Sequence, residues 1–233
     1  MRKVVVFLLV VVGIIGFMFF KKESLTKKTQ DPISDCNSNP NPRFTHNFTD
    51  VSAIDSLIPP IYSSGTGVKH TVLVNTIGRV PLYMPATGDL FQGSYYDSEG
   101  MGHYLLDFQI TCEVVVSFDH VAEPVEKIRA LLPSKPKNDS RTDFFEPKVK
   151  FRAGELIGYT SGTKNAKNWN FGVYNNTVQN YLSGDSEVKQ FPKYTTAICP
   201  FEYYSKEMKN PYYALLSDSF GDIRPDKNLC LRK

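Results

Sequence analysis

The hydrophobic pattern begins with an uninterrupted apolar run that starts at Val4, ends at Phe20 and holds no charged residue. A helix of this length spans roughly 26 Å at about 1.5 Å per residue, close to the thickness of a hydrocarbon core. A cleaved signal peptide needs a shorter apolar run and small residues at its cleavage site, and the residues just before Lys21 offer no such site. The run therefore predicts one transmembrane helix that acts as an uncleaved signal-anchor.

The remaining pattern divides the chain into further parts. Residues 1–22 hold the anchor, and residues 23–45 form a polar stalk rich in Lys, Ser, Asn, Asp and Pro. Residues 46–190 form a β-rich body, because short apolar runs alternate there with turn residues. Residues 191–233 form a C-terminal extension that contains cysteine. One sizeable globular core is expected for a chain of 233 residues.

The apolar runs of the body predict short strands joined by turns, as in a β sandwich or barrel. The runs cover residues 72–74, 80–84, 90–91, 104–110 and 114–118. Two short helices complete the prediction: helical spacing of apolar residues gives one over 123–132, and a second is expected over 211–216. The expected fold class is mainly β with short helices.

Two glycines organise the most regular stretch, residues 149–173. Gly154 and Gly162 stand between apolar segments, where a turn needs a backbone conformation that other residues avoid. The stretch therefore predicts three consecutive strands with a turn at each glycine.

Charge excludes one class of partner. The formal net charge is +3, and residues 1–28 carry +5 of it, which leaves −2 for the remainder. A slightly acidic body without a basic stripe gives no electrostatic reason to bind nucleic acid. The expected partner at the N-terminus is the membrane, through the apolar helix.

The four cysteines bear on the compartment. Their number is even and they form no Cys-x-x-Cys pair, which favours disulfides in an oxidising, extracytoplasmic environment over a zinc or redox site. Lysines and arginine flank the apolar run on both sides, so the charges alone do not orient it. Cys199 and Cys230 bracket one compact terminal segment and are expected to pair, which leaves Cys36 and Cys112 to pair or stay free.

Several segments carry a family resemblance. Residues 80–89, with Pro81 and Tyr83, the strand end at Phe118-Asp119-His120, the glycine hairpin and the strand 168–173 resemble lysostaphin-type zinc endopeptidases in order and spacing. The resemblance covers roughly residues 70–175. It implies the duplicated hybrid motif, a β sandwich with a groove for an extended peptide.

The zinc ligands of that family are largely missing. His70 could stand at the first ligand position, but the residue four places on is Val74, which cannot bind a metal. The His-x-His of the family is replaced by Asn168, Trp169 and Asn170. The resemblance therefore implies a metallopeptidase-like pseudoenzyme without catalytic residues or cofactor, with His70 as a vestige of the metal site.

The expected function is binding outside the membrane, in the cell envelope. His120 matches a histidine that assists the reaction in active relatives, and with Asn168, Trp169 and Asn170 it would line a degenerate groove for an envelope component, a peptide or a protein partner. Trp169 faces away from its two neighbours in a strand, so core packing and ligand stacking are both open for it. Two other functions stay open: an active zinc endopeptidase with a nonstandard ligand set, and a structural or assembly subunit of a membrane complex.

Overall fold

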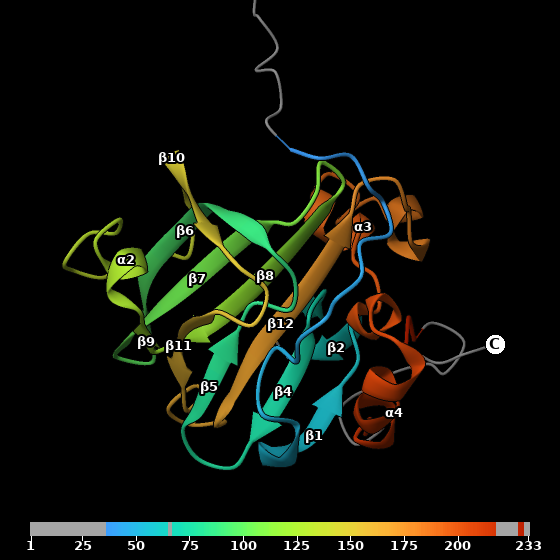
Figure 1. Ribbon diagram of the computed structural model, residues 1–233, viewed down its shortest axis with the longest axis horizontal. Helices are drawn as coiled ribbons and strands as arrows, with labels where there is room; N and C mark the ends of the chain where they lie inside the picture. The colour runs from blue at the N-terminus through green and yellow to red at the C-terminus, as the bar shows by residue number, and fades with distance from the viewer. Residues whose placement is uncertain (1–35, 65–66, 218–227, 231–233) are drawn as a thin grey trace, which may run out of the picture. The chain divides into compact units, whose positions relative to one another are not determined.

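The computed structural model describes residues 36–64, 67–217 and 228–230, and they form a mainly β domain with few helices (Figure 1). The strands are β1 (Ile54–Ile58), β2 (Tyr62–Ser64), β3 (Gly67–Lys69), β4 (Val72–Thr76), β5 (Val80–Tyr83), β6 (Gly88–Ser98), β7 (Met101–Gln109), β8 (Val114–Val121), β9 (Glu123–Pro124), β10 (Asp143–Phe151), β11 (Leu156–Thr160) and β12 (Asn168–Asn175). The helices are α2 (Glu126–Arg129), α3 (Pro192–Thr195), α4 (Lys206–Ala214) and the 3-10 helices η1 (Val51–Ala53), η2 (Tyr181–Gly184) and η3 (Pro200–Tyr203).

The expected transmembrane helix from Val4 to Phe20 lies outside these described residues. Within them, no helix has the length and apolar character needed to cross a bilayer.

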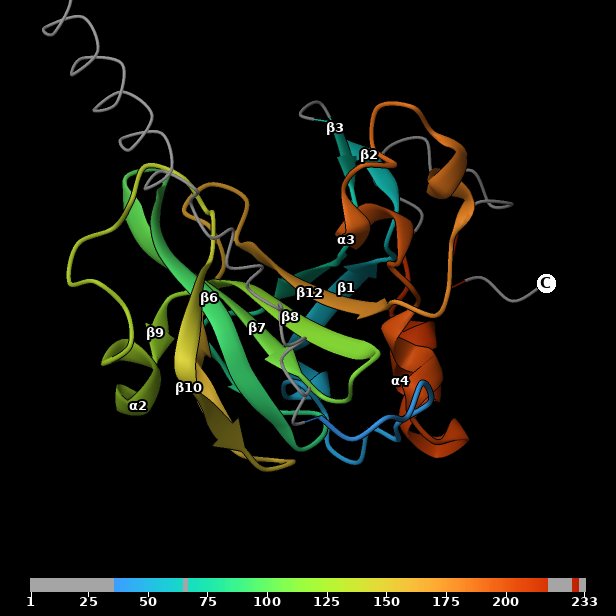
Figure 2. The ribbon, with the colours of Figure 1, turned by 90° about the horizontal axis from the view of Figure 1, so that it is seen from above.

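The larger sheet is antiparallel and has seven strands in the order β1-β4-β12-β8-β7-β6-β10. A three-stranded antiparallel sheet has the order β5-β11-β9, and β2 pairs with β3. Figure 2 shows the large sheet from above, with α2 near one edge and α4 near the other. The expected strands at 72–74, 80–84, 90–91, 104–110 and 114–118 all fall within β4 to β8 or overlap them.

The core lies against one face of the large sheet because apolar residues alternate along its strands. β8 turns Val116 and Phe118 inward, and β12 does the same with Phe171 and Val173, all of which are buried. β5 and β11 of the small sheet add buried residues to the same core cluster. The core thus fills the space between the two sheets.

Both predicted glycine turns are confirmed. Gly154 and Gly162 have φ values of 78° and 71°, in the left-handed region that favours glycine. They follow β10 and β11, so the three consecutive strands expected here are present.

The N-terminal boundary of the body differs from the expected one at residue 46. Cys36 forms a disulfide with Cys112 in the β7–β8 turn. Phe44 is buried, its backbone N–H donates to the Tyr203 carbonyl at 2.9 Å, and its ring stacks on the Tyr203 ring. Residues 36–45 were expected in the stalk, but aromatic packing and the disulfide place them in the body, which begins at Cys36.

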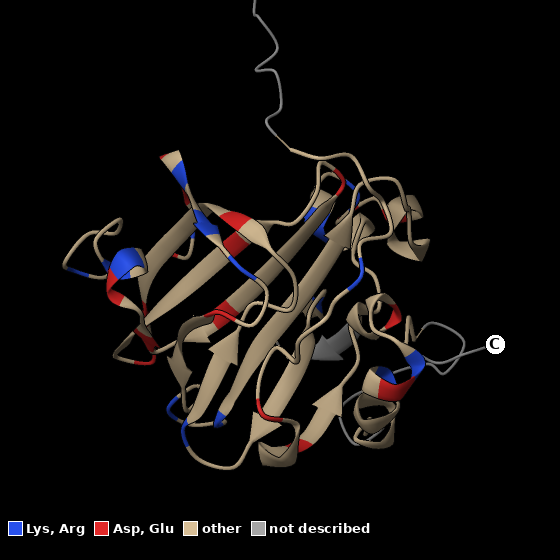
Figure 3. Ribbon diagram, viewed as in Figure 1, with Lys and Arg blue, Asp and Glu red and all other residues tan. Residues whose placement is uncertain are grey.

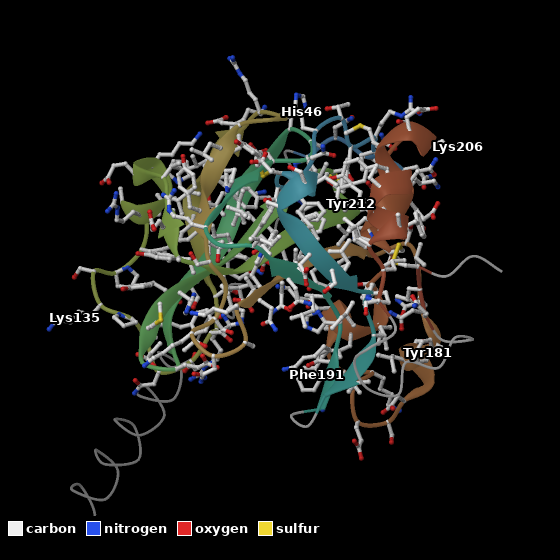
Figure 4. All side chains as sticks on the ribbon, turned by 90° about the horizontal axis from the view of Figure 1, so that it is seen from below. His46, Lys135, Tyr181, Phe191, Lys206 and Tyr212 are labelled. Carbon is white, nitrogen blue, oxygen red and sulfur yellow. A yellow bond between two sulfur atoms is a disulfide. The ribbon has the colours of Figure 1, made fainter. Side chains whose placement is uncertain are left out.

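The C-terminal extension shares the core of the body. Phe201 and Tyr212 are fully buried and stack at 4.9 Å between ring centroids, and Phe48 stacks on Tyr212 in turn. Figure 4 shows the labelled Tyr212 side chain beside α4, at the interior. The expected Cys199–Cys230 disulfide is present. The extension and the β body therefore form one packed unit over the described residues.

The two predicted helices have different bounds from those expected. Glu123 and Pro124 pair with β11, so the chain is extended there and only Glu126–Arg129 is helical. The C-terminal helix begins earlier than residue 211, at Lys206, because the Ser205 hydroxyl accepts a hydrogen bond from the Met208 N–H as an N-cap.

Candidate functional site

The second face of the large sheet carries a row of polar side chains. Along β8, Ser117 and Asp119 alternate with the core residues, and the β8–β12 register sets Asn170 opposite Asp119. The next pairings continue the row, with Asp107 opposite Ser117 and Gln92 opposite Asp107. We call this surface, from Asn170 to Gln92, the polar face. Elsewhere, Figure 3 shows charges of both signs mainly in loops, helices and strand ends.

A buried ion pair lies on the polar face. The Asp107 side chain is 0% exposed, and the Lys193 ammonium donates to its two oxygens at 2.9 and 2.7 Å. The Gln92 amide donates to the same carboxylate at 2.5 Å. Lys193 comes from α3, so the C-terminal extension covers this part of the sheet. Sequence reasoning missed both charged residues, although an aspartate within the apolar run of β7 was a visible signal.

His70 lies beside this ion pair and is held by tyrosines. Its Nδ1 shares a hydrogen bond of 2.8 Å with the Tyr174 hydroxyl, and its ring meets the Tyr194 ring edge-on at 4.4 Å. Burial lowers the pKa of His70 to about 4, with the Lys193 charge adding to the effect and Asp119 and Asp107 opposing it. The imidazole is therefore neutral at neutral pH and already engaged within the domain.

The strand end at Asp119 carries a second polar cluster. Tyr96 donates its hydroxyl hydrogen to Asp119 Oδ1 at 2.5 Å, and the His120 backbone N–H donates to the same oxygen at 2.8 Å. The Tyr96 oxygen also lies 3.1 Å from His120 Nδ1. Because the hydroxyl hydrogen is used, this contact requires Nδ1–H of His120 to donate. Burial and the Asp119 charge raise the pKa of Tyr96 well above its ordinary value, so Tyr96 stays a donor.

Two acceptors of this cluster remain open. His120 Nε2 carries the ring lone pair in the assigned tautomer, and it lies 4.0 Å from Asp119 Oδ2. Neither atom has a hydrogen-bond partner among the residues that the structure describes, and the two side chains are 16% and 25% exposed. His120 is fixed in a left-handed conformation with φ of 62°, and its carbonyl accepts from the Thr160 hydroxyl at 2.6 Å. The strand end therefore offers a preorganised pair of acceptors to a ligand that donates hydrogen bonds.

His103 lies against this pair from β7. It is fully buried, its ring meets that of His120 edge-on at 5.2 Å between centroids, and both ring nitrogens lack a hydrogen-bond partner within the described residues. Burial, with a smaller effect from His120, lowers the pKa of His103. A neutral, buried His103 supports the position of His120 by packing.

The three residues of the expected groove strand separate. Asn170 lies on the polar face, and the Thr71 hydroxyl donates to its Oδ1 at 3.2 Å. Asn168 is half-buried at the start of β12, where its carbonyl accepts from the Thr163 N–H. Trp169 is 0% exposed and packs on Phe48 and Phe118 in the core. Its assignment to the groove is wrong, because successive side chains of a strand point to opposite faces.

Few side chains at the positions expected to hold zinc are available to bind a metal ion. Val74 is buried in the core, and Asn170 is a neutral amide, while His70 is bound to Tyr174. Within the described ranges, no group of three or more His, Cys, Asp or Glu residues is arranged to hold a metal ion.

Comparison with solved structures finds matches at low sequence identity. Two crystal structures of Helicobacter pylori Csd3, from the orthorhombic and hexagonal forms, match 70% of this chain at 15% and 14% identity, with TM-scores of 0.40 and 0.39. The matches cover 35% and 34% of the Csd3 chain, so this chain spans about a third of its length. No family model and no curated protein matches the sequence.

Proposed function

We propose that this chain is a noncatalytic, extracytoplasmic binding domain of the lysostaphin type, anchored in the membrane by residues 4–20. The proposal includes the duplicated hybrid motif as its fold and the cell envelope as its location. The polar face around Asp119 and His120 binds an extended ligand that donates hydrogen bonds, such as a peptide bearing a primary amine. The mainly β fold with two antiparallel sheets agrees with this assignment.

One observation carries the proposal. His120 Nε2 and Asp119 Oδ2 are two partly exposed acceptors, held 4.0 Å apart by hydrogen bonds to the rest of the cluster. An ammonium group has three donors and a positive charge, so it suits a carboxylate beside an imidazole lone pair. The positions expected to hold zinc are instead engaged inside the domain: His70 with Tyr174, and Asn170 with Thr71. These engaged side chains favour binding over metal-assisted hydrolysis.

The test measures binding of matched peptides to the full chain held in lipid nanodiscs. A short peptide with a free lysine amine is compared with the same peptide acetylated at that amine. The free amine should bind about tenfold more tightly, because a hydrogen bond to a charged group contributes about 1.5 kcal/mol. Asp119→Asn keeps the size of the side chain and should abolish that preference.

Asp55→Asn is the matched control, since Asp55 is an exposed aspartate on β1 and lies outside the polar face. It should leave the preference unchanged. Elemental analysis of the same preparations measures zinc. Stoichiometric zinc together with peptide cleavage would replace the proposal by an active endopeptidase, and equal binding of both peptides to the unmodified chain would exclude the acceptor pair as the recognition element.

A further inference from the structure

A hollow of the described domain lies away from the polar face, at the far end of β12. It has a volume of about 550 Å³ and lies where the N-terminal segment runs beside the C-terminal elements (Figure 1). Its walls come from three regions distant in sequence, residues 41–43, 175–180 and 197–204, with Leu229. The volume is in the range of small-molecule sites, roughly 300–1,000 Å³.

The walls of this cavity are preformed. The Cys36–Cys112 disulfide fixes the segment that leads to residues 41–43, and the Cys199–Cys230 disulfide holds Leu229 next to the wall at Cys199. The Asn175 amide donates to the Pro40 carbonyl at 2.8 Å and so joins the N-terminal segment to β12. A cavity built in this way requires little ordering when a ligand enters.

The side chains of Asn175 and Asn180 in the walls are already satisfied, whereas the buried Tyr204 hydroxyl has no hydrogen-bond partner within the described residues. The Asn180 amide donates to the carbonyls of Tyr194 and Ala197, and its oxygen accepts from the Leu182 N–H. Asn175 donates to Pro40 and Tyr203 and accepts from Thr177. Apart from the Tyr204 hydroxyl, a ligand therefore meets mainly apolar surface inside. That surface is provided by Pro42, Val178, Ala197, Ile198 and Leu229.

The rim carries one cation that has no direct ion-pair partner within the described residues. Arg43 is exposed, and its guanidinium has no hydrogen bond or ion pair within the described parts of the chain. The acidic residue of the lining, Glu202, accepts from Lys209 at 2.7 Å and from the Tyr213 hydroxyl. Among the lining residues, the charge left without a direct partner is thus positive, although the Glu207 carboxylate of α4 also interacts with it electrostatically. A guanidinium binds a carboxylate through two parallel hydrogen bonds.

From these observations we infer that the cavity binds a small apolar molecule that ends in a carboxylate, with its apolar part between β12 and the C-terminal segment and its carboxylate on Arg43. Two sources share this chemistry: a short fatty acid and the free C-terminus of an apolar peptide. This site is separate from the acceptor pair of the polar face, so either one can exist without the other.

The experiment uses the full chain in lipid nanodiscs, with empty nanodiscs as the blank. Each acid is paired with its neutral amide: hexanoate with hexanamide, and N-acetyl-Phe-Leu with its C-terminal amide. At least one acid should bind saturably and about tenfold more tightly than its amide, as expected for a charge-assisted bidentate contact. The acid that binds identifies the source.

Variants locate the site. Arg43→Gln should bring acid and amide to equal affinity, while Val178→Glu, which places a negative charge at the mouth, should reduce acid binding further. Arg152→Gln removes the same charge from an exposed turn elsewhere and should change nothing. Fluorescence of the single tryptophan, Trp169, verifies that each variant is folded. Absence of saturable binding by both acids, or an acid preference that persists in Arg43→Gln, overturns the inference.

Discussion

The ion pair between Lys193 and Asp107 gives the sharpest test of the structure. Asp107 is completely buried and accepts two of its three hydrogen bonds from Lys193. In Lys193→Met the carboxylate keeps only the Gln92 amide, and breaking a buried pair in this way costs about 3–5 kcal/mol. Because Lys193 is 33% exposed, solvent screening favours the lower end, about 3 kcal/mol. With a urea dependence of about 3 kcal/mol per molar, the unfolding midpoint should fall by about 1 M.

The assay is urea unfolding followed by Trp169 fluorescence, and two further variants complete it. Combining Lys193→Met with Asp107→Leu removes both charges and should restore stability to within about 1 kcal/mol, since an apolar pair replaces a buried ion pair at little cost. Lys137→Met removes the lysine of an exposed pair with Asp143 and should cost less than about 1 kcal/mol. If Lys193→Met costs no more than Lys137→Met, Asp107 is not buried as the structure has it.

Three other predictions concern stability. Burial lowers the pKa of His70 from 6.5 to about 4, so the unfolded chain takes up a proton before the folded chain does as the pH falls. The free energy of unfolding should therefore drop by up to about 3 kcal/mol between pH 6.5 and pH 4. His70→Asn should flatten this pH dependence, as measured by urea unfolding. Gly162→Ala should destabilise by more than Gly78→Ala, because both have positive φ but only at Gly162 would a Cβ collide with backbone atoms, those of Lys167 and Asn168. Replacing Cys36 and Cys112 by serine should cost about 4.5 kcal/mol and replacing Cys199 and Cys230 about 3.7, as loops of 76 and 31 residues predict, a difference that thermal or urea unfolding resolves.

Local signals in the sequence predict most of the sheet. Apolar runs located β4 to β8, and Gly154 and Gly162 located two turns, because a strand or turn depends on a few adjacent residues. The Cys199–Cys230 pairing also followed from proximity along the chain. The bounds of α2 were missed because pairing with β11 keeps Glu123 and Pro124 extended, and helical spacing contains no information about a neighbouring strand.

The boundaries of the body were harder to predict for a similar reason. Residues 36–45 have the composition of a polar linker, and composition alone predicts a stalk. Phe44 is the exception within that stretch, and its partner Tyr203 lies far along the chain. Only the folded structure brings the two rings to 5.0 Å. A single aromatic residue in a polar segment can therefore indicate that the segment packs against the body, although the average composition of the segment does not show it.

The alternation of side chains along a strand explains which expected site residues lie on the polar face and which do not. His120 and Asn170 were expected in a groove, and alternation with the β8–β12 register does bring Asn170 opposite Asp119, next to His120. The same alternation requires Trp169 to point to the core, so three consecutive strand residues could never share one groove. Asp107 lies within an apolar run, a signal that was not used, and a buried carboxylate requires a cationic partner. That partner, Lys193, lies 86 residues further along the chain, in a segment whose sequence predicts neither a strand nor a helix. The sequence therefore does not identify the partner.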